Sequence, residues 1–279
     1  MQGSRVILVA ALLALYVTGA PKAGWAQELD LPGLAEKTKR SVVHLEILDH
    51  GGSQVSSGSG FVVAEGRLVT NEHVISEAAS VRAKLADGRT LDVPGVLAAD
   101  EEKDVAIVQL VGEDLPPPLT LGRSTGLRQG DEVIVIGSPK GLAGTLSTGI
   151  ISALRSDGLG ALDESGETAS WAIQTTAAIA PGSSGSPIMT RDGKVVAVAV
   201  GVVTGGGNIG FGVPIEEANR LLATLTPHAQ PKPFGSSENV ERNLIISGLF
   251  FVALALAFVL PGWLRRRRER RKRARPTVH

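Results

Sequence analysis

The sequence predicts an all-β fold built from two small barrels, and three observations support this prediction. Twelve short apolar runs follow one another along the chain, separated by turns rich in Gly, Asp and Ser. A triple proline at 116–118 divides these runs into six and six. The composition, with 43% hydrophobic residues and 34 glycines, is typical of a turn-rich globular protein.

The first barrel is expected over about residues 41–115, after a short amphipathic helix at 29–40. Its runs are rich in β-forming residues and are bounded by turn signals such as Asp87-Gly88. The six predicted strands are 42–48, 60–64, 67–70, 81–85, 90–98 and 105–110.

The second barrel is expected over about residues 120–215. Proline cannot donate a hydrogen bond to a sheet, so the triple proline is interpreted as the linker between the barrels. The six predicted strands are 132–137, 146–154, 171–175, 187–190, 194–200 and 209–213, and a helix at 215–225 closes the domain. The sequence thus predicts one folded domain over residues 27–226.

The N-terminal segment predicts export. Arg5 precedes an apolar run at 6–17, and Gly24-Trp25-Ala26 supplies the small residues that a signal peptidase reads. Residues 1–26 are therefore predicted to be a signal peptide, with the mature chain beginning at Gln27.

The C-terminal segment predicts a membrane anchor. Residues 244–264 carry no charge and would be about 30 Å long as a helix, enough to span a bilayer. The alternative is a buried core helix, but phenylalanines point all round this helix and four arginines follow at once. A flexible tether is expected at 227–243, which holds three prolines, and a basic cytoplasmic tail at 265–279.

Charge and cysteine content exclude several classes of function. Residues 27–243 hold 27 acidic and 17 basic residues, whereas residues 265–279 hold 9 basic residues and 1 acidic residue. An acidic body argues against nucleic-acid binding, and a stop-transfer signal explains the basic tail without it. The absence of cysteine excludes disulfides, thiol catalysis and cysteine metal sites.

Three separated residues together predict nucleophilic catalysis. Ser184 lies between glycines and prolines in 180–187, His73 lies where a β-rich run meets a polar turn, and Asp104 opens a predicted strand. A serine hydroxyl needs a base to take its proton and a carboxylate to orient that base. Each residue alone has a plainer interpretation, as a turn serine, a structural histidine or a surface acid. Their order, His-Asp-Ser, and their local contexts favour the catalytic one.

Two further features complete the candidate site. The backbone N–H groups of Gly182 and Ser184 are the expected oxyanion donors, although Pro181-Gly182 is also typical of a plain type II turn. His44 lies within a strand pattern and His50 in a glycine turn, so both are assigned structural or surface roles. No cofactor and no metal are expected.

Five ordered motifs resemble the HtrA/Deg family of trypsin-like serine proteases. They are Gly58-Ser59-Gly60-Phe61-Val62-Val63, Thr70-Asn71-Glu72-His73-Val74, Asp104-Val105-Ala106, Gln174-Thr175-Thr176-Ala177-Ala178-Ile179 with the serine loop, and Gly210-Phe211-Gly212-Val213-Pro214-Ile215. The resemblance covers residues 30 to 225. It implies a chymotrypsin-like double six-stranded β-barrel, protein or peptide substrates, and a serine loop that can flip between active and inactive shapes.

The chain departs from the family pattern at three positions. Ser186 stands where the family usually has glycine, Thr176 where it has aspartate, and Glu72 where it often has asparagine or alanine. A side chain at Ser186 would be strained if its backbone required a positive φ. These departures motivate an alternative function, a catalytically weak pseudoprotease that binds peptides or scaffolds a membrane complex.

The resemblance also implies a specificity. Trypsin-like enzymes that cut after Lys or Arg place an aspartate where this chain has Ala178. Ile179, Val202 and Val203 match family positions that line the primary specificity pocket, with plain β-core residues as the alternative. Cleavage after Val, Ala or a similar aliphatic residue is therefore expected.

The expected protein is a membrane-anchored serine endopeptidase of the bacterial inner membrane. Its protease domain would face the periplasm and act on unfolded or membrane-proximal envelope proteins. No PDZ domain is expected, since only a tether and a membrane helix follow residue 225. Family trimers often use aromatic residues near the N-terminal lead-in; residues 27–47 contain none, which leaves a homotrimer open.

Overall fold

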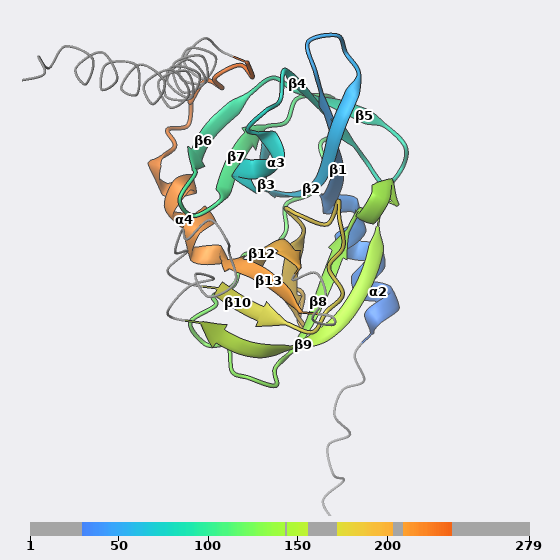
Figure 1. The fold of residues 1–279 in the computed structure, drawn as a ribbon, viewed down its shortest axis with the longest axis vertical. Helices are drawn as coiled ribbons and strands as arrows, with labels where there is room; N and C mark the ends of the chain where they lie inside the picture. The colour runs from blue at the N-terminus through green and yellow to red at the C-terminus, as the bar shows by residue number, and fades with distance from the viewer. Residues whose placement is uncertain (1–29, 143, 156–171, 203–208, 236–279) are drawn as a thin grey trace, which may run out of the picture.

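A computed structural model describes residues 30–142, 144–155, 172–202 and 209–235 of the 279-residue chain. Within them the chain forms two β units, drawn one above the other in Figure 1. The N-terminal unit is a seven-stranded antiparallel sheet, and the C-terminal unit is a closed six-stranded barrel. The predicted all-β fold of two units is confirmed, with one closed barrel and one half-barrel.

The N-terminal sheet has seven strands in the order β5-β4-β1-β2-β3-β7-β6. The prediction of a closed six-stranded barrel here was wrong. Pro94-Gly95 interrupts the predicted strand 90–98 and divides it in two, because proline offers no N–H to a ladder. The strands are β1 (Val42–Leu48), β2 (Gln54–Ala64), β3 (Arg67–Thr70), β4 (Ser80–Lys84), β5 (Thr90–Val93), β6 (Val96–Asp100) and β7 (Val105–Gln109).

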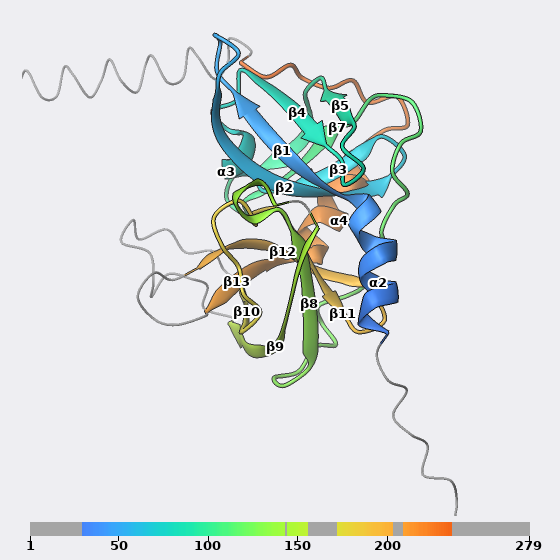
Figure 2. The same cartoon turned by 90° about the vertical axis from the view of Figure 1, so that its right-hand side faces the viewer.

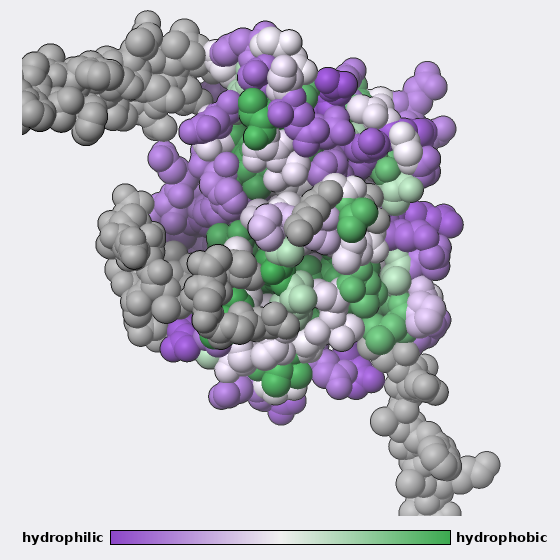
Figure 3. All heavy atoms as spheres, turned by 45° about the vertical axis from the view of Figure 1, so that its right-hand side comes forward, coloured by the Kyte–Doolittle hydropathy of each residue, from purple (hydrophilic) through white to green (hydrophobic). Residues whose placement is uncertain are grey.

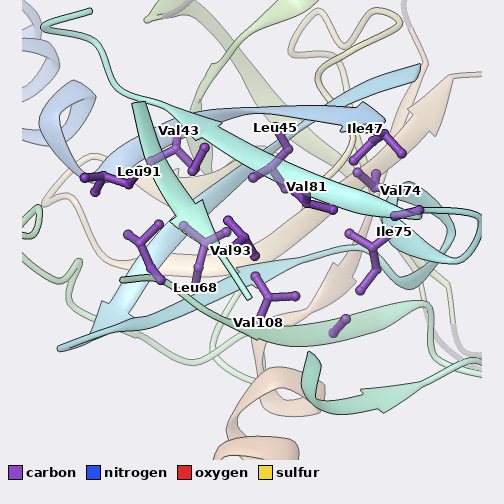
Figure 4. Close-up of a cluster of buried hydrophobic side chains, with 14 of the residues drawn as sticks. Val43, Leu45, Ile47, Leu68, Val74, Ile75, Val81, Leu91, Val93 and Val108 are labelled. Carbon is purple, nitrogen blue, oxygen red and sulfur yellow. The ribbon is translucent and has the colours of Figure 1, made fainter. Parts of the chain in front are cut away.

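One face of this sheet packs into a core of its own, and part of the other face packs into a second core; on β4 and β5 that second face is exposed. On β1, the alternate residues Val43, Leu45 and Ile47 point into the concave side of the sheet, where Figure 4 shows them packed together with Val81 and other side chains. The opposite face packs toward the C-terminal barrel. Successive strand side chains point to opposite faces, so strands buried on both sides read as continuous apolar runs.

The C-terminal barrel closes through the strand order β10-β13-β12-β11-β8-β9, which confirms the predicted six strands. β8 pairs with both β9 and β11, and β10 pairs with β9 and β13, so no edge is left open along the ring. The strands are β8 (Glu132–Gly137), β9 (Thr145–Arg155), β10 (Ala172–Thr175), β11 (Pro187–Thr190), β12 (Val195–Val202) and β13 (Gly210–Pro214).

A shared core joins the two units. It combines Phe61 and Ile107 from the sheet with Ile134 and Met189 from the barrel, all fully buried. Helix α4 (Ile215–Thr224) adds Ile215 and Ala218, and in Figure 2 it lies at the level where the two units meet. Since burial stabilises by about 25 cal/mol per Å² of apolar surface, this core fixes the relative position of the two units.

Two helical segments flank the units. The predicted lead-in helix is α2 (Leu31–Thr38), capped by Asp30, whose carboxylate accepts the N–H of Gly33 at 2.9 Å. A 3₁₀ turn, η1 (Lys39–Ser41), continues it into β1. A one-turn helix, α3 (Glu72–Ile75), stands where only a polar turn was expected, and it carries His73.

Part of the predicted tether is docked on the sheet. Lys232 exchanges two backbone hydrogen bonds with Val96 of β6, each 2.8 Å long, and forms an antiparallel bridge there. The side chain of Phe234 packs against the concave core. Residues 231–235, called the C-terminal strap below, are therefore part of the folded domain and do not form a free tether.

The remaining predicted segments lie outside the described residues. These are the signal peptide 1–26, the membrane helix 244–264, the tail 265–279 and residues 236–243 of the tether. Among the residues that the structure does describe, no helix has the length and apolar character needed to cross a bilayer.

The described surface is not uniform in polarity. In Figure 3 the upper part of the molecule is mostly hydrophilic, whereas hydrophobic patches gather across the middle and lower parts. The large hydrophobic side chains with substantial exposure are Val55, Val111, Leu142, Ile150 and Leu154. Three of these five follow β8 in the chain, on the barrel side.

Candidate active site

Strand pairing brings His73 and Asp104 together. β3 and β7 run antiparallel with Thr70 opposite Ala106, so the segment after β3 and the segment before β7 meet at one end of the sheet. His73 Nδ1 lies 2.8 Å from Asp104 Oδ2, and the backbone N–H of His73 donates to Asp104 Oδ1 at 2.9 Å. The carboxylate thus holds both the ring and the backbone of the histidine.

Asp104 is itself held in an uncommon backbone conformation. Its φ is +51°, a left-handed value that Asp tolerates better than most residues but that still stores strain. The buried side chain of Asn71 donates from Nδ2 to the carbonyl oxygen of Asp104 at 2.8 Å. Asn71 is therefore a positioning residue for Asp104. The sequence predicts no role for it beyond its place in the 70–74 motif. Its nearness to His73 in the chain was the only available signal.

The electrostatics of this pair favour a protonated histidine. Burial lowers the pKa of His73, but the hydrogen bond and charge of Asp104, together with the charge of Glu72, raise it more. The net result is a pKa above the usual 6.5. His73 remains accessible, with 48% of its side chain exposed, so that its other ring nitrogen can serve a reacting group.

The serine loop is built from a turn and two contacts with β2. The N–H of Ser183 donates to the carbonyl of Ala180 at 2.8 Å, and Gly182 between them has a φ of +91°, as in a type II turn after Pro181. Ser59 of β2 donates from Oγ to the Gly182 carbonyl at 2.8 Å and from its N–H to the Ser184 carbonyl at 2.7 Å. Ser59 therefore holds the serine loop in place, a role that its position in the 58–63 motif does not predict.

Two glycines allow the serine loop to approach the sheet. A Cβ at Gly58 would lie 2.5 Å from Val74 Cγ1 and 3.3 Å from the Ser184 carbonyl oxygen. A Cβ at Gly185, whose φ is +86°, would lie 2.0 Å from the Ser59 carbonyl oxygen. The serine loop and α3 therefore meet across Gly58, and this contact requires the absence of a side chain.

The expected oxyanion donors have no partner within the part of the chain that the structure describes. The backbone N–H groups of Gly182 and Ser184 donate to no acceptor among the described residues, whereas those of Ser183, Gly185 and Ser186 are all engaged. A backbone N–H group without an acceptor can bind an oxygen that carries developing negative charge.

The hydroxyl of Ser184 points elsewhere. Its Oγ donates to the backbone carbonyl of Val200 on β12 at 2.6 Å, and no hydrogen bond joins it to His73 within the described part of the chain. The structure thus pairs His73 with Asp104 and places the serine loop beside them, but the nucleophile is bonded to the barrel.

The specificity residues are placed only in part. Ile179 is buried in the barrel core, where its Cδ1 would lie 2.7 Å from a Cβ at Gly210, and its role in the specificity pocket stays a prediction. Ala178 is exposed and its carbonyl accepts the hydroxyl of Ser147 at 2.8 Å. Val203 and the side chain of Val202 lie outside the described residues.

The structure describes the surroundings of two departures from the family pattern, Ser186 and Thr176. Ser186 does not have a positive φ, so its backbone does not carry the strain considered above. Its side chain is fully buried, and its Oγ has no hydrogen-bond partner among the residues that the structure describes. Thr176 exchanges hydrogen bonds with the backbone of Ile150 on β9, two of 3.0 Å each. Neither side chain enters the contact between the serine loop and α3.

The other two histidines noted in the sequence lie apart from these contacts. His44 is buried in β1, and its Nδ1 has no partner in the described ranges of the chain. Burial lowers the pKa of His44 more than the charge of Glu46 raises it. His50 lies in an exposed turn after β1.

The half-barrel, the closed barrel and the helix after β13 define the chymotrypsin-like class of protein fold. The family model of the trypsin-like peptidase domain matches residues 58–198, which is half of the chain. The chain belongs to this family, and its relatives support the HtrA/Deg type of serine protease, whose members are hydrolases.

Three comparisons give the extent of the similarity. The mitochondrial serine protease HTRA2 of Bos taurus is 37% identical over 220 residues, which make up 76% of this chain and 46% of that protein. The "Probable periplasmic serine endoprotease DegP-like" of Chlamydia muridarum is 37% identical over 177 residues, 62% of this chain and 34% of that protein. The chain spans less than half the length of these two relatives.

A solved structure, the HtrA-type protease AlgW with tripeptide, superimposes with a TM-score of 0.61 and 31% identity. The alignment covers 71% of this chain and 64% of that chain.

Proposed function

We propose that this protein is a serine endopeptidase in which Ser184, His73 and Asp104 form the catalytic triad. The observation that carries the proposal is the His73–Asp104 pair, held by two hydrogen bonds of 2.8 and 2.9 Å. It lies beside a serine loop in which two N–H groups have no acceptor among the described residues. A base, its orienting carboxylate, a nucleophile and oxyanion donors are the four parts that acyl transfer requires.

The proposed reaction follows from these positions. Ser184 Oγ attacks the carbonyl carbon of a peptide bond while His73 Nε2 takes the hydroxyl proton, and the carbonyl oxygen becomes an oxyanion held by the N–H groups of Gly182 and Ser184. The C–N bond then breaks as His73 gives that proton to the leaving nitrogen. Water, activated in the same way, hydrolyses the acyl-enzyme and regenerates Ser184.

The proposed substrates are extended or unfolded polypeptides with an aliphatic residue before the cleaved bond. No fixed negative charge stands at Ala178 to attract Lys or Arg, and hydrophobic patches gather on the barrel side of the surface. A peptide library should therefore be cleaved after Val or Ala. A dominant preference for Lys or Arg would contradict this specificity.

A labelling experiment tests the catalytic assignment. A serine-directed fluorophosphonate should label Ser184 and stop hydrolysis of an unfolded protein substrate. Ser184→Ala should not be labelled, and its rate of substrate hydrolysis should fall by at least about 10⁴-fold, since triad members act as a unit. Ser183→Ala is the matched control because it changes the adjacent hydroxyl. Full activity of Ser184→Ala, with loss of activity in Ser183→Ala, would show that Ser183 is the nucleophile and would contradict the proposal.

The proposed location is the bacterial inner membrane, with the protease domain outside the cytoplasm. This proposal is supported by the sequence of residues 1–26, 244–264 and 265–279, and one relative is named a periplasmic endoprotease. Protease added to spheroplasts should digest the folded domain and spare a tag fused after His279. A digested tag with a protected domain would reverse the orientation.

A second candidate function is a peptide-binding pseudoprotease, and one observation favours it. Ser184 Oγ is bonded to Val200 and not to His73. If the protein only binds peptides, the fluorophosphonate should leave Ser184 unlabelled at every peptide concentration, while a labelled peptide still binds. Labelling of Ser184 in wild type excludes this candidate.

A further inference from the structure

The one-turn helix α3, which carries His73, is too short to hold its own position. It contains only Glu72–Ile75, and the side chain of Asn71, its N-cap residue, makes no capping hydrogen bond within the described part of the chain. A helix shorter than about 12 residues is marginal in water unless tertiary contacts stabilise it. The position of the proposed base therefore depends on what packs against α3.

Two residues of α3 belong to the concave core of the N-terminal sheet. Val74 and Ile75 are both buried there, and Figure 4 shows their side chains within this cluster. They follow His73 directly in a single helical turn. The packing of Val74 and Ile75 therefore sets where the imidazole lies relative to Asp104.

The C-terminal strap closes this core on the side of α3. Phe234 packs against the concave core, and it lines a hollow of about 370 Å³ together with Ile75 of α3 and Val96 of β6. The two neighbours of Phe234 in the strap line the same hollow. The strap thus forms one wall of a space whose opposite wall is the helix that carries His73.

Contacts at both ends hold the strap in this position. At one end the backbone of Lys232 pairs with Val96, and in Figure 1 the chain after α4 runs beside β6. A Cβ at Gly95 would lie 2.1 Å from the Lys232 carbonyl oxygen, so this close approach requires glycine. At the other end, a Cβ at Gly235 would lie 3.8 Å from Ala79 Cα, in the segment that follows α3. The strap therefore extends from the edge of the sheet to the segment after the helix.

We propose that Phe234 is a positioning residue for His73: by closing the hollow beside α3, the strap holds this helix where the imidazole can serve both Asp104 and Ser184. This inference rests on the proposed function. A displacement of about 1 Å in a catalytic group can cost about 10²-fold in rate, so a small movement of α3 is enough to matter. The catalytic unit then ends at residue 235, after the strap, and not with α4.

The competing explanation is that Phe234 only adds stability, as any core side chain does. Leu115 separates the two explanations, because it is also a partly buried side chain packed against the concave core. It does not line the hollow beside α3. Truncating either residue removes apolar contacts from the same core, but only Phe234→Ala removes the wall that faces α3.

The test compares Phe234→Ala, Phe234→Leu and Leu115→Ala in the full-length protein. Hydrolysis of a peptide that the wild-type protein cleaves gives kcat and KM. Fluorophosphonate labelling, taken to completion, counts the competent sites in each sample, so that a loss of folded protein is not mistaken for a loss of rate. Circular dichroism follows the stability of each variant.

Phe234→Ala should lower kcat per labelled site by about 10- to 100-fold, because α3 loses its support. KM should be nearly unchanged, since the strap supports the base. Phe234→Leu should restore most of the rate, and Leu115→Ala should keep the wild-type rate per site even where it is less stable. Equal rates per site in Phe234→Ala and Leu115→Ala would overturn the positioning role and leave the protease function standing. Absence of labelling in wild type would instead refute the proposed function.

A second variant reaches the same contact from the side of β6 and leaves the strap sequence intact. Gly95→Ala places a Cβ against the Lys232 carbonyl and should displace the strap, whereas Gly126→Ala, whose Cβ would meet nothing within 4 Å, is the control. Hydrogen exchange of the Lys232 amide reports the release of the strap. Gly95→Ala should show faster exchange together with a lower kcat per labelled site. Faster exchange at an unchanged kcat would overturn the proposal, even if Phe234→Ala did not fold.

Discussion

The two halves of the candidate site differ in how completely they are assembled. On the sheet, His73 is held by Asp104 through both ring and backbone, and Asn71 supports the carboxylate's own backbone. On the barrel, Ser59 fixes the backbone of the serine loop, but the Ser184 hydroxyl is bonded to Val200. The comparison teaches that the backbone of both halves is in place. Activity then depends on whether the Ser184 hydroxyl donates to Val200 or to His73.

The largest expected effect comes from breaking the assembled half. Asp104→Asn keeps the size of the side chain but removes the charge that orients and stabilises the imidazole, so kcat should fall by about 10⁴. The measurement is single-turnover hydrolysis of a peptide, with circular dichroism as the check on folding. Combining Asp104→Asn with Ser184→Ala should cost no more than the worse single change, and additive losses would contradict a joint role.

A smaller effect is expected from separating the two halves. Gly58→Ala places a Cβ 2.5 Å from Val74 Cγ1 and 3.3 Å from the Ser184 carbonyl, and so pushes α3 and the serine loop apart. A displacement of about 1 Å can cost about 10²-fold in kcat/KM, and overpacking costs about 1–3 kcal/mol of stability. Gly126→Ala is the control, because its Cβ would contact nothing within 4 Å. Equal activity of the two variants would show that the contact is not required.

The pH dependence of the assembled half should respond to Glu72. Its charge helps raise the pKa of His73, and only the neutral imidazole can act as base, so activity should rise with pH through that pKa. Glu72→Gln should lower the pKa and move the acidic limb of the kcat/KM profile to lower pH. Glu77→Gln, which changes an exposed acid two residues after α3, should leave the limb in place. A limb that moves equally in both would indicate a general charge effect.

The smallest effect concerns the seam between the halves, where His44 faces η2 (Pro139–Gly141): its Nε2 would lie 3.9 Å from a Cβ at Gly141. Burial lowers its pKa below 6.5 in the folded protein. As pH falls, His44 therefore becomes protonated in the unfolded chain before it does so in the folded protein, and stability is lost below pH 6.5. In urea titrations His44→Leu should show less of this loss than wild type. An unchanged pH dependence would remove His44 as its cause.

Most strands could be predicted because their signal is local. β3, β8 and β11 have the predicted bounds, since apolar runs between turn residues define them without reference to the rest of the chain. Closure of the sheet could not be predicted in this way, because it depends on which strands pair. The break at Pro94-Gly95 was visible in the sequence, but its consequence for the edge of the sheet was not.

The residues of the candidate site could be predicted from the sequence, but the hydrogen bonds that they make could not. His73, Asp104 and Ser184 could be chosen from residue type, order and context, and the structure pairs the first two. The roles of Asn71 and Ser59 depend on side-chain contacts across strands, which periodicity does not report. The direction of the Ser184 hydroxyl depends on one torsion and on a bulge at Val200, and neither has a sequence signal.

The C-terminal strap has a consequence for substrate choice if the protein is anchored as proposed. With residues 231–235 docked on β6, only residues 236–243 separate the domain from the proposed span, and a free chain of that length reaches about 16 Å. The enzyme would then meet membrane-bound polypeptides at a high effective concentration and distant ones hardly at all. Height above the bilayer, more than sequence around the cleaved bond, would decide which proteins are cut.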